Sequence, residues 1–172
     1  MNVPTLRTRR LVLRQYAIAD AVGLLRLARQ PETTRYLQGL PQDLRSHAES
    51  VRRVLAADYP DGLGSWVVTE PDSGLVIGRS HLRPSDQLPG APAEIGWFLM
   101  PERWGLGLAR EATEAVIRHG FDTVGVPEIW ALVHEDNKPS FGLAQRFGFE
   151  EAGSGVHYGA VHRRLVLTPS AA

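Results

Sequence analysis

The chain has 172 residues, and its 19 basic and 19 acidic side chains leave it with no formal net charge. This length predicts a single domain over residues 1–172 that buries its own core. Zero net charge gives no general attraction to nucleic acid or anionic lipid, and the absence of cysteine excludes disulfides, thiolate metal sites and a cysteine nucleophile. The N-terminus lacks the apolar core of a signal peptide, and no run approaches the ~18 apolar residues of a membrane span. We therefore expect a cytoplasmic protein with neither a membrane partner nor a nucleic-acid partner.

In the first half of the chain, the hydrophobic pattern predicts one strand, two helices and a hairpin. The strand covers 10–14, the helices cover about 20–28 and 44–55, and the hairpin strands cover 65–69 and 75–82. Asp20 is a candidate cap for the first helix. Ser46 and Glu49 have the spacing of a capping box near the start of the second helix.

In the second half, strands and helices alternate. The pattern predicts a buried strand over 93–100, a glycine turn over 104–107, a helix from Leu108, a strand over 128–134, a short helix from about Asn137, and closing strands over 149–158 and 161–167. A strand–helix–strand unit favours parallel pairing, whereas hairpins are antiparallel. The fold class predicted is α/β (α+β), with a mixed, mostly antiparallel sheet flanked by helices.

The most informative stretch runs from the buried strand into the glycine turn and the next helix. Gly105 and Gly107 allow successive backbone N–H groups to point inward, and the helix start at Leu108 adds unsatisfied donors with partial positive charge. Such an arrangement binds a phosphate or pyrophosphate. The sequence has no GxxxxGK[ST] loop, and Arg110 stands where a dinucleotide fingerprint needs its third glycine, which excludes both familiar phosphate loops.

The string from Trp104 to Ala112 resembles the Q/R-x-x-G-x-G/A loop of the GCN5-related N-acetyltransferases. It is most similar to the branch related to ribosomal-protein N-terminal acetyltransferases, where Trp-Gly-x-Gly-x-Ala-x-Glu-Ala is typical. Leu106 stands where lysine is common in the family, which removes one cation from the loop but leaves its backbone amides in place.

Three further motifs carry the same resemblance, in the same order and at similar spacing. They are a first strand at 8–14, a fourth strand at 93–97, and an Asn-x-x-Ser helix start at Asn137 and Ser140 that is followed by a closing Gly-Phe. The resemblance covers roughly residues 5–168. It implies the acyl-CoA N-acyltransferase fold, in which the strands corresponding to 93–100 and 128–134 splay apart.

The resemblance also implies that acetyl-CoA binds as the acyl donor. Its pyrophosphate would lie on the amides from Gly105 to Ala109, its pantetheine arm would pair with the backbone near Leu99 and Met100, and its thioester would enter the splayed notch. The cofactor-binding residues expected on this basis are Leu99, Met100, Trp104, Gly105, Leu106, Gly107, Leu108, Ala109, Asn137 and Ser140.

Two residues are expected to take part in catalysis. Ser140 is the hydroxyl in the position where the branch has its thiolate partner, and Asn137 beside it also fits a simple helix cap. Glu94 lies on an otherwise apolar strand, where a carboxylate must be paired or functional, so it is either a general base or an orienting partner. His134 is a rival base, and a chain of waters is a third possibility.

The function predicted is transfer of an acetyl group from acetyl-CoA to a primary amine, by direct attack in a ternary complex. The acceptor is either a protein N-terminus or a small-molecule amine. The alternative is a non-catalytic acyl-CoA-binding sensor or partner module. We expect no metal site, because the histidines show no metal-ligand spacing. The sequence does not determine the oligomeric state, and base rates alone favour a homodimer.

Overall fold

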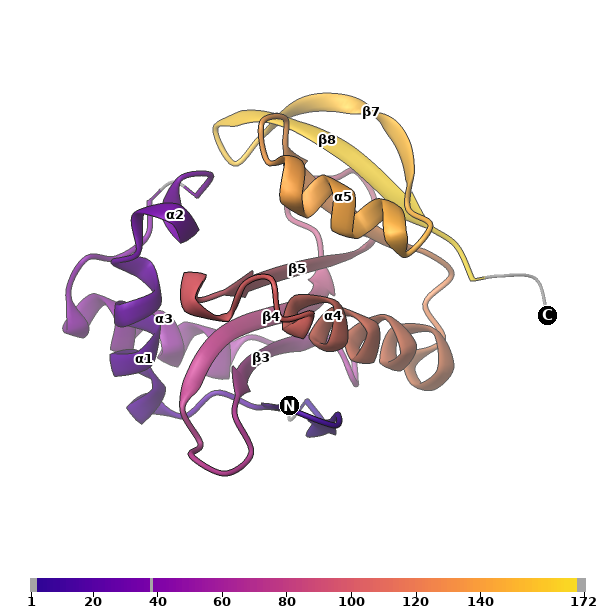
Figure 1. Ribbon diagram of the computed structural model, residues 1–172. Helices are drawn as coiled ribbons and strands as arrows, with labels where there is room; N and C mark the ends of the chain where they lie inside the picture. The colour runs from indigo at the N-terminus through magenta and orange to yellow at the C-terminus, as the bar shows by residue number, and fades with distance from the viewer. Residues whose placement is uncertain (1–2, 38, 170–172) are drawn as a thin grey trace.

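The structure is a computed structural model that describes residues 3–37 and 39–169 (Figure 1). In this part of the chain, eight strands form one sheet in the order β1-β2-β3-β4-β5-β6-β8-β7. All neighbouring strands pair antiparallel except β5 and β6, which are parallel. The strands are β1 (Leu6–Arg7), β2 (Val12–Arg14), β3 (Gly64–Thr69), β4 (Val76–Pro84), β5 (Ala93–Leu99), β6 (Ile129–His134), β7 (Glu150–His157) and β8 (Ala160–Leu167). The predicted mixed, mostly antiparallel sheet flanked by helices is confirmed.

The two central strands separate soon after they meet. β4 pairs with β5 along the whole length of β5, but β5 and β6 share a single register pair, Glu94 with Trp130. Beyond that pair the strands diverge toward their C-terminal ends at Leu99 and His134. We call the region between these diverging ends the notch. The splayed central strands implied by the family resemblance are therefore present.

Helices cover both faces of the sheet. α4 (Leu108–Arg118) and α5 (Lys138–Arg146) pack on one face, which we call the α4 face, over a core that includes Trp66, Val68 and Ile77. α1 (Ala21–Ala28) and α3 (Leu44–Ala56) pack on the other, the α1 face, over Val67 and Val76. The two cores use alternate residues of β3 and β4, because successive side chains of a strand point to opposite faces.

Local polar contacts decide where the first helices begin. The capping box predicted from Ser46 and Glu49 is wrong, because Asp43 caps α3 and accepts hydrogen bonds from Ser46 N at 2.9 Å and Ser46 Oγ at 2.7 Å. Asp20 occupies the predicted N-cap position of α1, but its side chain makes no capping hydrogen bond to that helix. Its carboxylate forms a two-pronged ion pair with Arg14 at 2.7 and 2.8 Å.

Short helical turns complete the chain. They are η1 (Ile18–Asp20), α2 (Pro31–Thr34), η2 (Pro101–Arg103) and the π-helical turn η3 (His119–Val124) that continues α4. α4 follows β5, and α5 follows β6. Because β5 and β6 are parallel, both helices begin at the same end of the sheet, next to the open end of the notch.

Candidate active site

The turn between β5 and α4 holds a row of unused backbone donors. Gly105 and Gly107 both adopt left-handed conformations, with φ of 73° and 75°. A Cβ atom added at Gly105 would meet no atom within 4 Å, so the backbone conformation and not crowding requires glycine there. In the described residues, no acceptor is recorded for the amides from Gly105 to Arg110. The predicted phosphate-binding turn is thus an open cradle of backbone N–H groups.

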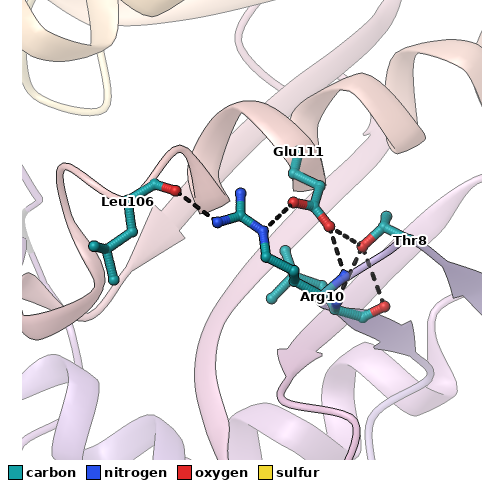
Figure 2. Close-up of polar contacts among 5 residues, drawn as sticks. Thr8, Arg10, Leu106 and Glu111 are labelled. Carbon is teal, nitrogen blue, oxygen red and sulfur yellow. Dashed lines mark hydrogen bonds and ion pairs between the residues drawn. The ribbon is translucent and has the colours of Figure 1, made fainter.

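A polar network from the start of the chain holds this cradle (Figure 2). Glu111, in the first turn of α4, accepts hydrogen bonds from Thr8 Oγ1 at 2.6 Å and from Arg10 N at 2.8 Å. The Arg10 guanidinium bridges Glu111 Oε2 at 2.7 Å and the Leu106 carbonyl at 2.9 Å. Arg10 therefore fixes the direction of one carbonyl of the cradle, and its Nη2 atom would lie 3.5 Å from a Cβ atom at Gly107.

The network also settles the charge of Glu111. Burial alone would raise the pKa of this carboxyl, but the hydrogen bonds from Thr8 and Arg10 outweigh burial and hold the pKa below its usual range. Both carboxylate oxygens are taken up by Thr8 and Arg10. A bound phosphate group would therefore meet the amides and the guanidinium and not an unpaired anion.

The end of β5 has one free and one occupied backbone edge. Met100 N donates to Ile77 O at 2.8 Å, so the Met100 amide faces β4. Because backbone groups alternate along a strand, the Leu99 amide faces the notch. The Leu99 carbonyl accepts from Trp104 Nε1 at 2.8 Å, which ties the half-exposed indole to the strand end. Of the two residues expected to contact a pantetheine arm, Leu99 offers its amide and Met100 does not.

Asn137 and Ser140 lie at the start of α5, on the other side of the notch. Asn137 caps the helix, and its side-chain oxygen accepts from Ser140 N at 3.2 Å. The Ser140 side chain is partly buried, and no partner for its Oγ is recorded among the described residues. The geometry gives Asn137 its capping role and leaves the Ser140 hydroxyl available.

Glu94 is buried on the α1 face, at the last residue pair before the notch opens, and is 4% exposed. Its carboxylate accepts hydrogen bonds from Ser85 Oγ and from Tyr158 Oη, the latter at 2.8 Å, and His81 Nε2 lies 3.9 Å away. Burial alone would raise the pKa of Glu94, but the approach of His81 and the two hydroxyl donors outweigh burial and lower it. Glu94 is therefore an ionised, hydrogen-bonded carboxylate.

The contact of Tyr158 with Glu94 was not among the features predicted from the sequence. Tyr158 lies in the turn between β7 and β8, 64 residues away, with a left-handed φ of 50°. Burial and the charge of Glu94 raise the pKa of its hydroxyl, so the phenol stays protonated and donates. The only local signal was a tyrosine before Gly159 in a turn, which does not specify a partner.

His134 ends β6 on the α1 face, where its ring contacts Tyr36 and His162 at centroid distances of 5.2 and 5.5 Å. Its Nδ1 atom accepts the Asp136 N–H at 3.2 Å. A neutral ring with Nδ1 as acceptor carries its proton on Nε2. His134 is therefore not set up to take a proton from a substrate at Nε2, which weakens it as a rival base.

Within residues 3–37 and 39–169, no three His, Asp or Glu side chains gather in a way that could hold a metal ion. In the same residues, every helix falls short of the length and apolar character that crossing a membrane requires.

Comparison with known proteins identifies the family. Residues 10–150 match the model of the acetyltransferase (GNAT) domain. The uncharacterized N-acetyltransferase YoaA of Bacillus subtilis is 32% identical over 151 residues, which are 87% of this chain and 85% of that protein. An acetyltransferase structure from Agrobacterium tumefaciens aligns with a TM-score of 0.79 and 27% identity, over 98% of this chain and 96% of that one. Mycobacterium smegmatis RimJ, solved in complex with CoA-disulfide, shares the fold with a TM-score of 0.76 and 22% identity, over 98% and 87% of the two chains. The chain belongs to the GNAT acetyltransferase family.

Proposed function

We propose that the protein transfers the acetyl group of acetyl-CoA to a primary amine by direct attack within a ternary complex. The observation that carries the proposal is the open row of amides from Gly105 to Arg110, which begins a helix and has a guanidinium beside it. A twin phosphate is the ligand that such a row of donors fits best. We take the catalytic unit to be the domain over residues 1–172.

The residues around the cradle fit coenzyme A along its length. The pyrophosphate would be held by the amides of Gly105, Leu106, Gly107, Leu108 and Ala109, with Trp104 at the edge of the turn. The pantetheine arm would run into the notch beside the Leu99 amide, with Met100 beyond it. Asn137 and Ser140 would lie at the sulfur end, because α5 begins at the same end of the sheet as α4.

The arrangement supports a meeting of donor and acceptor at the notch. The cradle and the start of α5 belong to the α4 face, whereas Glu94, Phe98 and His134 are on the α1 face. The notch is where the sheet between the two faces is unpaired. A donor held at the cradle and an amine held on the α1 face would approach each other there from opposite sides.

The reaction asks little of the protein beyond positioning. Acetyl-CoA supplies an acyl group already activated as a thioester. The amine nitrogen forms the new C–N bond, the C–S bond breaks with its electrons on sulfur, and the proton lost by nitrogen is balanced by the one that sulfur takes up. The Leu99 amide is the donor proposed for the developing oxyanion, and Ser140 Oγ is the donor proposed for the departing sulfur.

Glu94 is proposed as the anion that attracts and orients the acceptor's ammonium group. An ammonium has a pKa near ~8 to 10, whereas the pKa of Glu94 is lowered from about 4.5. The ammonium is therefore the much weaker acid, and full proton transfer from it to Glu94 is unfavourable. The proton therefore leaves through water, and Tyr158, bound to Glu94, orients the carboxylate.

Acetyl transfer is tested by incubating the protein with acetyl-CoA and a panel of amines, and by measuring thiol release and the mass of the product together. Thiol release that matches the acetylated amine supports the proposal. CoA binding with no acetylated product from any amine would instead support the non-catalytic sensor. Light scattering checks the predicted homodimer, and fractionation of cells checks the predicted cytoplasmic location.

A further inference from the structure

A cavity of about 170 Å³ lies on the α1 face, between the helices and the centre of the sheet. Its wall is mostly apolar. An apolar cavity of about 150 Å³ in another protein takes up benzene, so this one has room for a single ring or a branched aliphatic group. The apolar lining comes from α1, the segment after α2, α3 and β5, and includes Leu24, Leu27, Leu37, Leu40, Val51 and Phe98.

One end of the lining carries a positive charge. Arg79 lies on β4, and its guanidinium carbon stacks 4.6 Å from the centre of the Phe98 ring. Tyr16 lines the same cavity and adds a phenol to its wall. Among the described residues, no carboxylate is recorded as an ion-pair partner of Arg79. A guanidinium has five N–H donors, so most of them remain for an anion.

Two buried polar atoms of the same lining also lack partners. Thr33 is 9% exposed and His47 is 6% exposed, yet in the described residues Thr33 Oγ1 and His47 Nε2 make no hydrogen bond. An orphaned buried polar atom costs about 1–3 kcal/mol, and native structures contain few of them. Burial lowers the pKa of His47, so its ring is neutral at pH 7 and adds a polar atom without adding charge. Both atoms indicate a ligand with polar groups of its own.

The cavity adjoins the notch. Glu94 pairs with Trp130, so four residues further along the two parallel strands Phe98 lies level with His134. Phe98 is a wall of the cavity, and its neighbour Leu99 presents its amide to the notch. Tyr36 lies after α2 and contacts His134, so the segment that lines the cavity also reaches the far side of the notch.

We propose that the acceptor is a free α-amino acid with an apolar side chain of leucine to phenylalanine size. Its side chain occupies the cavity, its carboxylate pairs with Arg79, and its amine points to the notch. The proposal rests on the acetyl transfer proposed above and names the substrate for it. A protein N-terminus carries a neutral amide where the amino acid has its carboxylate, which would leave Arg79 without an anion. A simple amine also has no carboxylate and would leave Arg79 without an anion.

The test measures kcat/KM with saturating acetyl-CoA for matched acceptors. They are L-leucine, L-phenylalanine, L-leucinamide, isoamylamine, L-aspartate and a tripeptide that begins with leucine. We expect leucine and phenylalanine to exceed the amide, the simple amine and the tripeptide by about 30-fold or more, the size expected for a partly desolvated ion pair. Aspartate should be a poor acceptor, because its side chain has no apolar group to fill the cavity.

Variants separate the carboxylate contact from general damage. Arg79→Met should lower kcat/KM for leucine by about 30-fold and should affect isoamylamine, which has no carboxylate, far less, so the preference for the acid disappears. Thr33→Val should weaken leucine binding without changing the KM for acetyl-CoA. Arg52→Met, on the exposed side of α3, is the matched control and should change neither.

Failure of this inference is distinct from failure of the proposed function. Turnover with the tripeptide or isoamylamine as fast as with leucine overturns the inference and leaves acetyl transfer standing. If no amine is acetylated, calorimetry with L-leucine and CoA decides. Leucine binding that Arg79→Met abolishes still supports the cavity as an amino-acid site, and its absence overturns the inference.

Discussion

Replacing Arg10 by alanine should weaken CoA binding while leaving the fold intact. The substitution removes the ion pair with Glu111 and the hydrogen bond to the Leu106 carbonyl, but Thr8 and the backbone amide at position 10 still satisfy Glu111. The Arg10 side chain is 43% exposed, so the ion pair is worth only about 0.2–1 kcal/mol. The bond to Leu106 adds about 0.5–1.5 kcal/mol.

The loss of CoA affinity in Arg10→Ala follows from two changes at the cradle. With Arg10 gone, the Leu106 carbonyl is free to turn, and a cation next to Gly107 is lost. Together these losses predict about 1–2 kcal/mol of binding free energy, a 5- to 30-fold rise in the Kd for CoA. The turnover number at saturating acetyl-CoA should change less than threefold, because Arg10 contacts the cradle and none of the groups proposed to act on the thioester.

Calorimetry measures this effect directly, with CoA and with acetyl-pantetheine, which lacks the phosphates. Only the CoA affinity should fall, and the loss should shrink as salt is added, since the contribution is partly electrostatic. Arg9→Ala removes an exposed neighbouring arginine and is the control. An equal loss for acetyl-pantetheine, or the same loss in Arg9→Ala, would refute the role assigned to Arg10.

Three further outcomes are expected. Gly107→Ala should raise the KM for acetyl-CoA severalfold and lower stability by about 1 kcal/mol, because alanine is strained at a φ of 75°; an unchanged melting temperature would contradict this. Ser140→Ala should lower kcat by about 10-fold or more with an unchanged Kd for CoA, measured by steady-state kinetics and calorimetry, and unchanged turnover would remove Ser140 from the mechanism. Burial lowers the pKa of His81 and of His47, so the unfolded chain binds more protons than the folded one below pH ~6.5. Stability should therefore be full above that pH and fall as pH decreases through the lowered pKa values, by up to about 1.4 kcal/mol per unit for each group, and thermal unfolding at constant ionic strength that shows no loss from pH 7.5 to 5.5 would contradict it.

The sequence predicted best those features that depend on neighbours along the chain. Apolar residues at regular spacing predicted the strand over 93–100 and the helix from Leu108. The structure has these elements at Ala93–Leu99 and Leu108–Arg118. The cradle could also be predicted from local sequence, because two glycines before a helix determine the conformation of its backbone. The helix predicted over 44–55 is present as Leu44–Ala56, but its cap was assigned to Ser46, whereas the structure has Asp43, which is an equally good capping residue, at the N-cap.

The features that could not be predicted depend on contacts distant in sequence. Glu94 was singled out as a carboxylate in an apolar strand, but nothing local shows that Tyr158 and Ser85 would bind it. The cavity also depends on distant contacts, since Arg79 on β4 and Thr33 on α2 line one cavity only in the folded chain. Periodicity shows which face of an element is apolar but not which elements a polar side chain will meet.

The loop at Leu106 shows why such distant contacts matter for function. Leu106 stands where lysine is common in the family, so the loop lacks one cation. A comparison confined to the motif would therefore predict weaker phosphate binding. In the structure, Arg10 brings a guanidinium from a segment 96 residues earlier and bonds it to the Leu106 carbonyl itself. Glu111 secures that guanidinium at 2.7 Å, so a carboxylate that would otherwise repel a phosphate is used to hold the compensating charge. The positive charge of the cradle is therefore a property of the folded chain, supplied where β1, β2 and α4 meet, and the motif accounts for only its backbone.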